Sequence, residues 1–169
     1  MHIGIVYTDM RDRNKKIDSC LEENHIRCDR LKVLSAQPAA DASHFASQTW
    51  GRARRGGTRT SVVDVRGFCR PDYSPERVLA LFRAEVMHEA GGPRTVLIGD
   101  FSHLIYDRFD VKVSLEGMSE ERAKTANVFC CLRAEGFWSL DPSQIAALFE
   151  LHQSLAFGSE KIMMATPVR

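Results

Sequence analysis

RTVLIGDFSH, residues 94–103, has the pattern of a buried strand followed by a polar turn. Its apolar run, residues 96–98, ends abruptly in Gly99 and Asp100. A short apolar run bounded by turn residues is typical of a strand covered on both faces, which indicates a parallel sheet flanked by helices. Ligands of such sheets collect outside the carboxyl ends of the strands, so Asp100 and His103 are the first candidates for function. The alternative is that Asp100 caps a turn and His103 is an ordinary surface residue.

Strands and helices alternate about five times along the chain. Apolar or β-branched runs predict strands at residues 2–9, 29–34, 58–65, 94–98 and 127–132. Periodic apolar positions and helix caps predict helices at residues 11–24, 41–50, 74–89, 111–124 and 141–155, with loops at 67–73 and 133–140. The alternation predicts a three-layer α/β sandwich around a mostly parallel sheet of about five strands. We expect one domain at residues 1–158, followed by a tail at 159–169.

Composition excludes several classes of protein. The 169 residues carry 23 Lys and Arg against 22 Asp and Glu, so a net charge of +1 gives no reason to expect nucleic acid or an anionic membrane as a partner. No run approaches the roughly 18–20 apolar residues of a membrane span, and residues 1–12 lack a signal-peptide pattern, so we expect a cytoplasmic protein. The five cysteines have no CxxC spacing, which argues for reduced buried thiols instead of a disulfide framework or a structural zinc site.

Polar residues gather where the predicted strands end. If the sheet is parallel, its carboxyl edge brings together the candidate ligand-binding residues Asp9, Asp64, Arg66, Asp100, Ser102, His103 and Arg133. Three carboxylates at one edge could hold Mg²⁺, but Asp is also common at such positions because it caps and turns well. We therefore assign no metal ligand and no catalytic residue, and the sequence identifies no cofactor.

The motifs of nucleotide enzymes and hydrolases are missing. There is no GxxxxGK[ST], and the first predicted strand is followed by TDMRDR, residues 8–13, instead of GxGxxG. Without a glycine-rich turn, backbone amides cannot wrap a triphosphate in the usual way. No GxSxG elbow surrounds Ser102, and adjacent residues such as Ser102 and His103 seldom face one another in a turn.

Three other features have two interpretations each. The basic stretch 51–57 could meet phosphates or form a solvated loop. Cys130 and Cys131 lie on opposite faces of one strand, which favours core packing over a thiolate sensor. His152, on the apolar side of the last predicted helix, is either a core or boundary histidine or a ligand contact.

The order of several short motifs resembles a known family. These motifs are HIGIVY at 2–7, YSPER at 73–77 leading to GDFSH at 99–103, Glu116, VFCCLR at 128–133, Asp141-Pro142 and His152. Together they resemble the MEDS domain, the methanogen/methylotroph sensory domain of DcmR-type regulators, which is similar to a RecA/KaiC-like core without its P-loop. The chain departs from the family pattern at His103, which replaces a tryptophan, and at Leu132-Arg133, which replaces Tyr-Asp. The resemblance implies a sensory or regulatory domain that acts in signalling or transcription control through small-molecule or protein contacts.

The leading hypothesis is a sensory domain that binds a small ligand in a crevice beside Asp9, Asp64, Asp100 and His103 and passes the signal to a partner protein. A homodimer is compatible with it. Direct nucleic-acid binding is not expected, because the chain shows neither a helix-turn-helix signature nor a basic excess.

Two alternatives remain open. The first is a degenerate nucleotide-binding or Mg²⁺-dependent phosphate enzyme that uses the same aspartates, with Arg54, Arg55 or Arg66 on phosphate. The second is a ligand-free interaction module, in which an exposed apolar surface pairs with another subunit; its residues would be Phe101, Leu104, Ile105 and Tyr106.

Overall fold

The computed structural model of the chain describes residues 1–35, 58–67, 69–86, 92–104, 108–158 and 163–165. Several expectations from the sequence fall outside these residues. They are the helix at 41–50, the basic stretch 51–57 with Arg54 and Arg55, and Ile105 and Tyr106.

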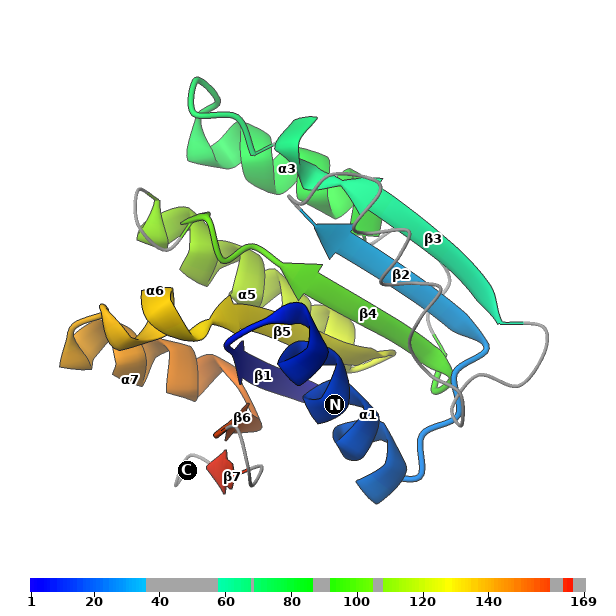
Figure 1. The fold of residues 1–169 in the computed structure, drawn as a ribbon. Helices are drawn as coiled ribbons and strands as arrows, with labels where there is room; N and C mark the ends of the chain where they lie inside the picture. Colours follow the sequence, from blue (N-terminus) through cyan, green and yellow to red (C-terminus); the bar gives the residue numbers. More distant parts are fainter. Residues whose placement is uncertain (36–57, 68, 87–91, 105–107, 159–162, 166–169) are drawn as a thin grey trace.

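One sheet organises the described part of the chain (Figure 1). Its strands are β1 (His2–Tyr7), β2 (Arg30–Ser35), β3 (Arg59–Asp64), β4 (Thr95–Asp100), β5 (Asn127–Arg133), β6 (Ser154–Phe157) and β7 (Met163–Ala165). They lie in the order β3-β2-β4-β5-β1-β6-β7, and all neighbouring pairs are parallel except β6 and β7. The expected three-layer α/β sandwich with a mostly parallel sheet is confirmed, with six parallel strands instead of about five.

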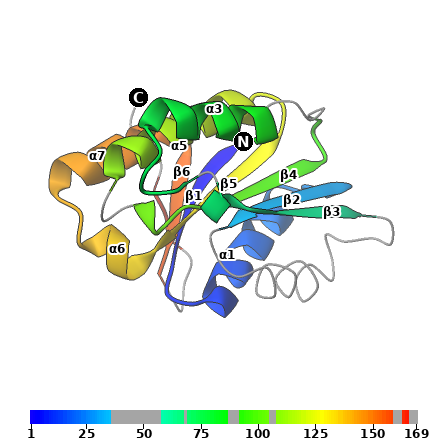
Figure 2. The ribbon, with the colours of Figure 1, turned by 90° about the horizontal axis from the view of Figure 1, so that it is seen from above.

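Helices cover both faces of this sheet (Figure 2). The described helices are α1 (Met10–Glu23), α3 (Pro75–Val86), α5 (Phe109–Ala123), α6 (Ala134–Trp138) and α7 (Pro142–Leu151), and a 3₁₀ turn, η1, spans Val65–Gly67. Helix α1 covers one face, whereas α3, α5 and α7 lie on the other. Among the helices described here, none has both the length and the apolar character to span a bilayer.

The two faces of each strand pack into separate cores, as the alternation of strand side chains requires. Cys131 belongs to the core beneath α1, together with Ile17, and Cys130 belongs to the core beneath α5, together with Leu115. The prediction that the two thiols point to opposite faces is confirmed. All five cysteines are buried and free. Burial raises the pKa of Cys131 to about 12, so this thiol stays protonated and behaves as a small apolar side chain.

The chain after β5 differs from the sequence prediction. The expected loop at 133–140 contains the short helix α6. The expected helix at 141–155 begins as predicted, with Asp141 in a capping box and Pro142 in the first turn, but it ends at Leu151. The chain then forms β6 beside β1, because the free edge of β1 pairs with residues 154–156 and buries Leu155 completely. Part of the expected tail at 159–169 also joins the sheet, as β7.

Candidate functional site

Asp100 ends β4 at the carboxyl edge of the sheet, where only 4% of it is exposed. The hydroxyl of Tyr7 donates to its Oδ2 at 2.7 Å, and Nη1 of Arg13 donates to the same oxygen at 2.5 Å. Oδ1 accepts a hydrogen bond of 2.8 Å from the hydroxyl of Ser102. We call Tyr7, Arg13, Asp100 and Ser102 the carboxyl-edge cluster. Both oxygens of its central carboxylate are engaged by donors from inside the fold.

Neighbouring groups complete this cluster. The Ser102 hydroxyl also lies 3.2 Å from the carbonyl oxygen of Cys131 and accepts a hydrogen bond of 3.0 Å from the backbone N–H of Arg133. Burial, reinforced by the charge of Asp100, raises the pKa of Tyr7 well above its usual range, so this hydroxyl remains a donor at neutral pH. Of the residues predicted to meet at this edge, Asp100, Ser102 and Arg133 do so.

The connection from β1 to α1 leaves no loop for a phosphate. Only Thr8 and Asp9 separate the two elements, and the carboxylate of Asp9 caps α1 by accepting from the N–H of Asp12 at 2.8 Å. The Asp12 carboxylate in turn accepts from the N–H of Thr8 at 2.9 Å and pairs with Lys16 at 2.7 Å. Since two carboxylates already lie at the helix end that binds phosphate in nucleotide enzymes, an anion would meet like charge there.

The remaining predicted residues do not join the carboxyl-edge cluster. Asp64 forms an exposed ion pair with Arg66 of 2.5 Å, and this guanidinium holds the pKa of Asp64 below its usual value. Strand β2 separates β3 from β4, so Ser35 lies between Asp64 and Asp100. His103 is exposed at the surface. The predicted seven-residue site therefore divides into a closed internal cluster and separate surface groups.

The prediction of an exposed apolar surface near Phe101 is wrong for Phe101 and Leu104, the two of its four residues that the structure describes. Phe101 and Leu104 are each 3% exposed. Among the described residues, the exposed large apolar side chains are Leu81 and Trp138, and Trp138 is 64% exposed. Trp138 borders a pocket of about 270 Å³, which is also lined by Val6, Thr8, Lys16, Ala134, Phe157 and Gly158.

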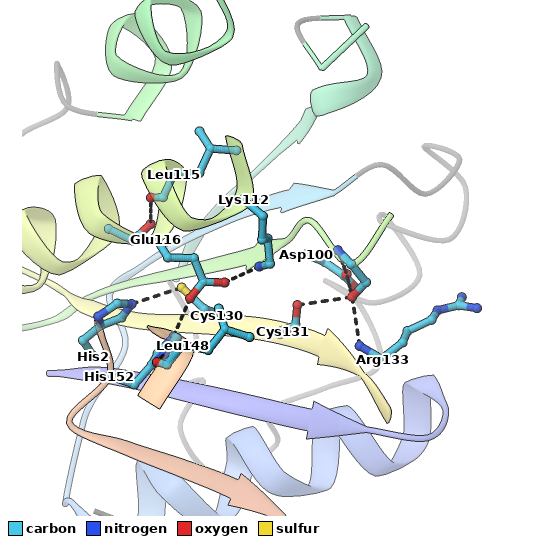
Figure 3. Close-up of polar contacts among 12 residues, drawn as sticks. His2, Asp100, Lys112, Leu115, Glu116, Cys130, Cys131, Arg133, Leu148 and His152 are labelled. Atoms are coloured by element: carbon cyan, nitrogen blue, oxygen red, sulfur yellow. Dashed lines mark hydrogen bonds and ion pairs between the residues drawn. The ribbon is translucent and has the colours of Figure 1, made fainter. Parts of the chain in front are cut away.

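A second polar cluster lies beneath α5 and α7, on the other side of β5 (Figure 3). It consists of His2 on β1, Lys112 and Glu116 on α5, Cys130 on β5 and His152 at the end of α7, and we call it the buried centre. Each of these residues is 3% exposed or less. Glu116 pairs with Nζ of Lys112 through Oε1 and lies 2.7 Å from Nε2 of His152 through Oε2. Nε2 of His2 lies 3.1 Å from the sulfur of Cys130.

The charges of the buried centre are set by burial and by the ion pair. Burial alone would raise the pKa of Glu116, but the charges of Lys112 and His152 outweigh it and the pKa lies far below the usual range. Burial likewise opposes the charge of Lys112, yet Glu116 raises the net pKa of this ammonium. Burial lowers the pKa of His2 to about 4 and raises that of Cys130 well above its usual value. At neutral pH the centre therefore holds one buried ion pair, a neutral His2 and a protonated thiol.

Local sequence explains how these side chains meet. Lys112 and Glu116 are four residues apart and so lie on the same side of α5, beside the apolar stripe of Val111 and Leu115. Gly4 leaves room for the ring of His152, since a Cβ at this position would lie 3.3 Å from the ring. The motifs of the family resemblance include Glu116 and His152, but Lys112 was not predicted from the sequence. Charged residues interrupting the buried side of an otherwise apolar helix were the available signal.

The protein is an α/β domain with a mostly parallel sheet, in which the carboxyl edge is closed and the main polar centre is buried. No protein-family model matches the chain, and no curated protein matches it. Solved structures similar to it include the cytoplasmic domain of EssC, with a TM-score of 0.41, 14% identity and coverage of 99% of this chain and 34% of that one. A KaiC-like protein from Pyrococcus horikoshii has a TM-score of 0.48, 12% identity and coverage of 96% and 75%. This chain spans about a third of the EssC domain.

Proposed function

We propose that this chain is a non-catalytic sensory or regulatory domain that acts in signalling or transcription control by binding a small ligand or a signalling protein. The carboxylate of Asp100 carries the proposal. A nucleotide enzyme of this fold class needs open groups at the carboxyl edge for Mg²⁺ and phosphate. Here both oxygens of Asp100 are bound by Tyr7, Arg13 and Ser102, and Arg13 is 1% exposed.

The start of α1 supports the same proposal. The carboxylates of Asp9 and Asp12 occupy its first turn, and Lys16 is committed to Asp12 and to the carbonyl oxygen of Val6 at 2.7 Å. Nothing in this arrangement presents free amides and a free cation to a triphosphate. The resemblance to the MEDS family points in the same direction, because that family lacks the P-loop. A homodimer is compatible with the proposal.

The test is a paired measurement of nucleotide binding and turnover. We expect no binding of a fluorescent ATP analogue with Mg²⁺, and no phosphate release from ATP or GTP above a buffer blank. Magnesium-dependent turnover that disappears in Asp100→Asn but persists in Asp64→Asn would overturn the proposal and establish the phosphate enzyme instead. Asp64 is a suitable control because it is an exposed carboxylate at the same edge of the sheet. Circular dichroism of both variants would check that each is folded.

A further inference from the structure

Four side chains of the buried centre together form a set of metal-ligand types. His2, Glu116, Cys130 and His152 each offer one ligand atom, and these four atoms lie within 4.8 Å of one another. They come from four separate parts of the sequence, and the fold brings them to one point between β1, β5, α5 and the end of α7. Imidazole nitrogen, thiolate sulfur and carboxylate oxygen are the ligands that Zn²⁺ takes in proteins.

The ring of His152 gives an independent indication of a ligand. Its Nδ1 lies 2.7 Å from the carbonyl oxygen of Leu148, which can only accept, so Nδ1 carries the proton. Without a proton on Nε2, this nitrogen presents a lone pair toward Oε2 of Glu116, 2.7 Å away. Two acceptors at this distance require a positive centre between them, either a proton or a metal ion. A backbone carbonyl that fixes the tautomer of a histidine is also the usual outer partner of a metal-bound imidazole.

The spacing of the four atoms is close to what a tetrahedral ion requires. With bonds of about 2.0–2.1 Å to nitrogen or oxygen and about 2.3 Å to sulfur, neighbouring ligand atoms lie roughly 3.3–3.7 Å apart. The observed separations include 2.7 Å between His152 and Glu116 and 3.1 Å between His2 and Cys130, and the largest among the four atoms is no more than 4.8 Å. An ion would push each of these pairs apart by less than about 1 Å.

We propose that His2, Glu116, Cys130 and His152 bind a zinc-like transition-metal ion, and that Lys112, which pairs with the other oxygen of Glu116, weakens this binding through repulsion of like charge. This inference rests on the proposed function and names the ligand class that such a sensor would detect. Binding forms a metal–sulfur bond and releases the thiol proton of Cys130 to solvent. Glu116 bonds to the metal through Oε2, the oxygen that faces His152, while Oε1 keeps its pairing with Lys112. The charge of Lys112 therefore opposes binding of the ion.

The experiment measures metal directly, because the site is 3% exposed or less and loads through folding or opening of the chain. The full chain is unfolded in guanidinium with a chelator and a reductant, then refolded with Zn²⁺ or Co²⁺ and freed of excess ion. We expect one bound ion per chain by elemental analysis. The Co²⁺ form should show the visible bands of a tetrahedral ion and a thiolate-to-cobalt charge-transfer band.

Two neighbouring cysteines provide matched variants. Cys130→Ser should lose the charge-transfer band and most of the bound metal, whereas Cys131→Ser should keep both, because Cys131 faces the opposite core. Lys112→Met should bind the ion more tightly, by about tenfold or more, since a competing unit charge is removed. A structural role for Lys112 alone predicts no gain in affinity.

The outcomes separate this inference from the proposed function. Absence of bound metal in the refolded native chain, or equal loss of metal in Cys130→Ser and Cys131→Ser, would overturn the metal site. Neither result contradicts the proposal of a non-catalytic domain, which fails only if nucleotide turnover is found. A metal-bound protein that also hydrolyses nucleotide would keep the site and overturn the function.

Discussion

Removing the guanidinium of Arg13 should destabilise the protein strongly, because it leaves the buried carboxylate of Asp100 without its cation. The side chains of Arg13 and Asp100 are 1% and 5% exposed, and Nη1 and Oδ2 lie 2.5 Å apart. Breaking a buried ion pair from one side costs about 3–5 kcal/mol. In a chain of this size, each kcal/mol lowers the melting temperature by roughly 2–4 °C. We therefore expect Arg13→Met to lower the midpoint of thermal unfolding by about 6–20 °C.

The assays are thermal unfolding for the midpoint and urea unfolding for the free energy, both followed by circular dichroism. Arg66→Met is the matched control. Arg66 forms an ion pair of the same length with Asp64, but their side chains are 54% and 41% exposed, so its loss should change stability little. The double variant Arg13→Met/Asp100→Asn should be more stable than Arg13→Met, because the unpaired charge is gone. A loss of less than about 1 kcal/mol in Arg13→Met, with an unchanged urea slope, would refute the reasoning. It would mean that Asp100 is open to solvent ligands, and the argument against a phosphate enzyme would fail with it.

Two further predictions concern single side chains. Gly4→Ala should cost about 1–3 kcal/mol in urea unfolding, since its Cβ would lie 2.1 Å from Cδ2 of Leu155. Gly117→Ala in α5 should stabilise the chain, because its Cβ would lie 4.0 Å from Cδ2 of Leu151, an ordinary contact distance. A neutral Gly4→Ala would contradict the close packing of β1 against β6. Burial raises the pKa of Asp18 to about 6, so the fold disfavours its ionised carboxylate. The resulting loss of folding stability is absent below the unfolded pKa of 3.8 and complete above the folded pKa. Asp18→Asn should thus raise the melting temperature at neutral pH but not near pH 4, and an equal gain at both would show that its charge is not the cause.

The sequence predicted the architecture well because its signals are local. Apolar runs such as residues 96–98 and caps such as Asp141-Pro142 determine elements within a few residues, and their alternation implies a parallel sheet. The errors lie where tertiary pairing decides. Residues 154–157 continue an apolar helical pattern, but they form β6 because they pair with the edge of β1. The sequence of that segment alone does not indicate that it pairs with a strand more than a hundred residues earlier in the chain.

The candidate site was harder to predict because sequence position does not give the partner of a polar group. The carboxyl ends of the strands were placed at the right edge, yet the closure of that edge depends on Arg13, which reaches Asp100 across 87 positions of the chain. The buried centre joins His2 to Cys130 across 128 positions. Spacing rules for metal ligands apply to motifs held on one or two turns, so a site assembled from distant strands and helices escapes them.

Lys112 lies between the two clusters and gives them a physical connection. Its ammonium pairs with Glu116 in the buried centre and lies 5.9 Å from the ring centre of Phe101, the residue that follows Asp100. The charge of Asp100 also contributes to raising the pKa of Lys112. If an ion binds Glu116, it neutralises part of the negative charge that Lys112 faces, and the charge of Asp100 contributes a larger share of the attraction. The proposed metal site would then alter the electrostatics of the carboxyl edge through one side chain, which is the kind of differential interaction that a ligand-driven change requires.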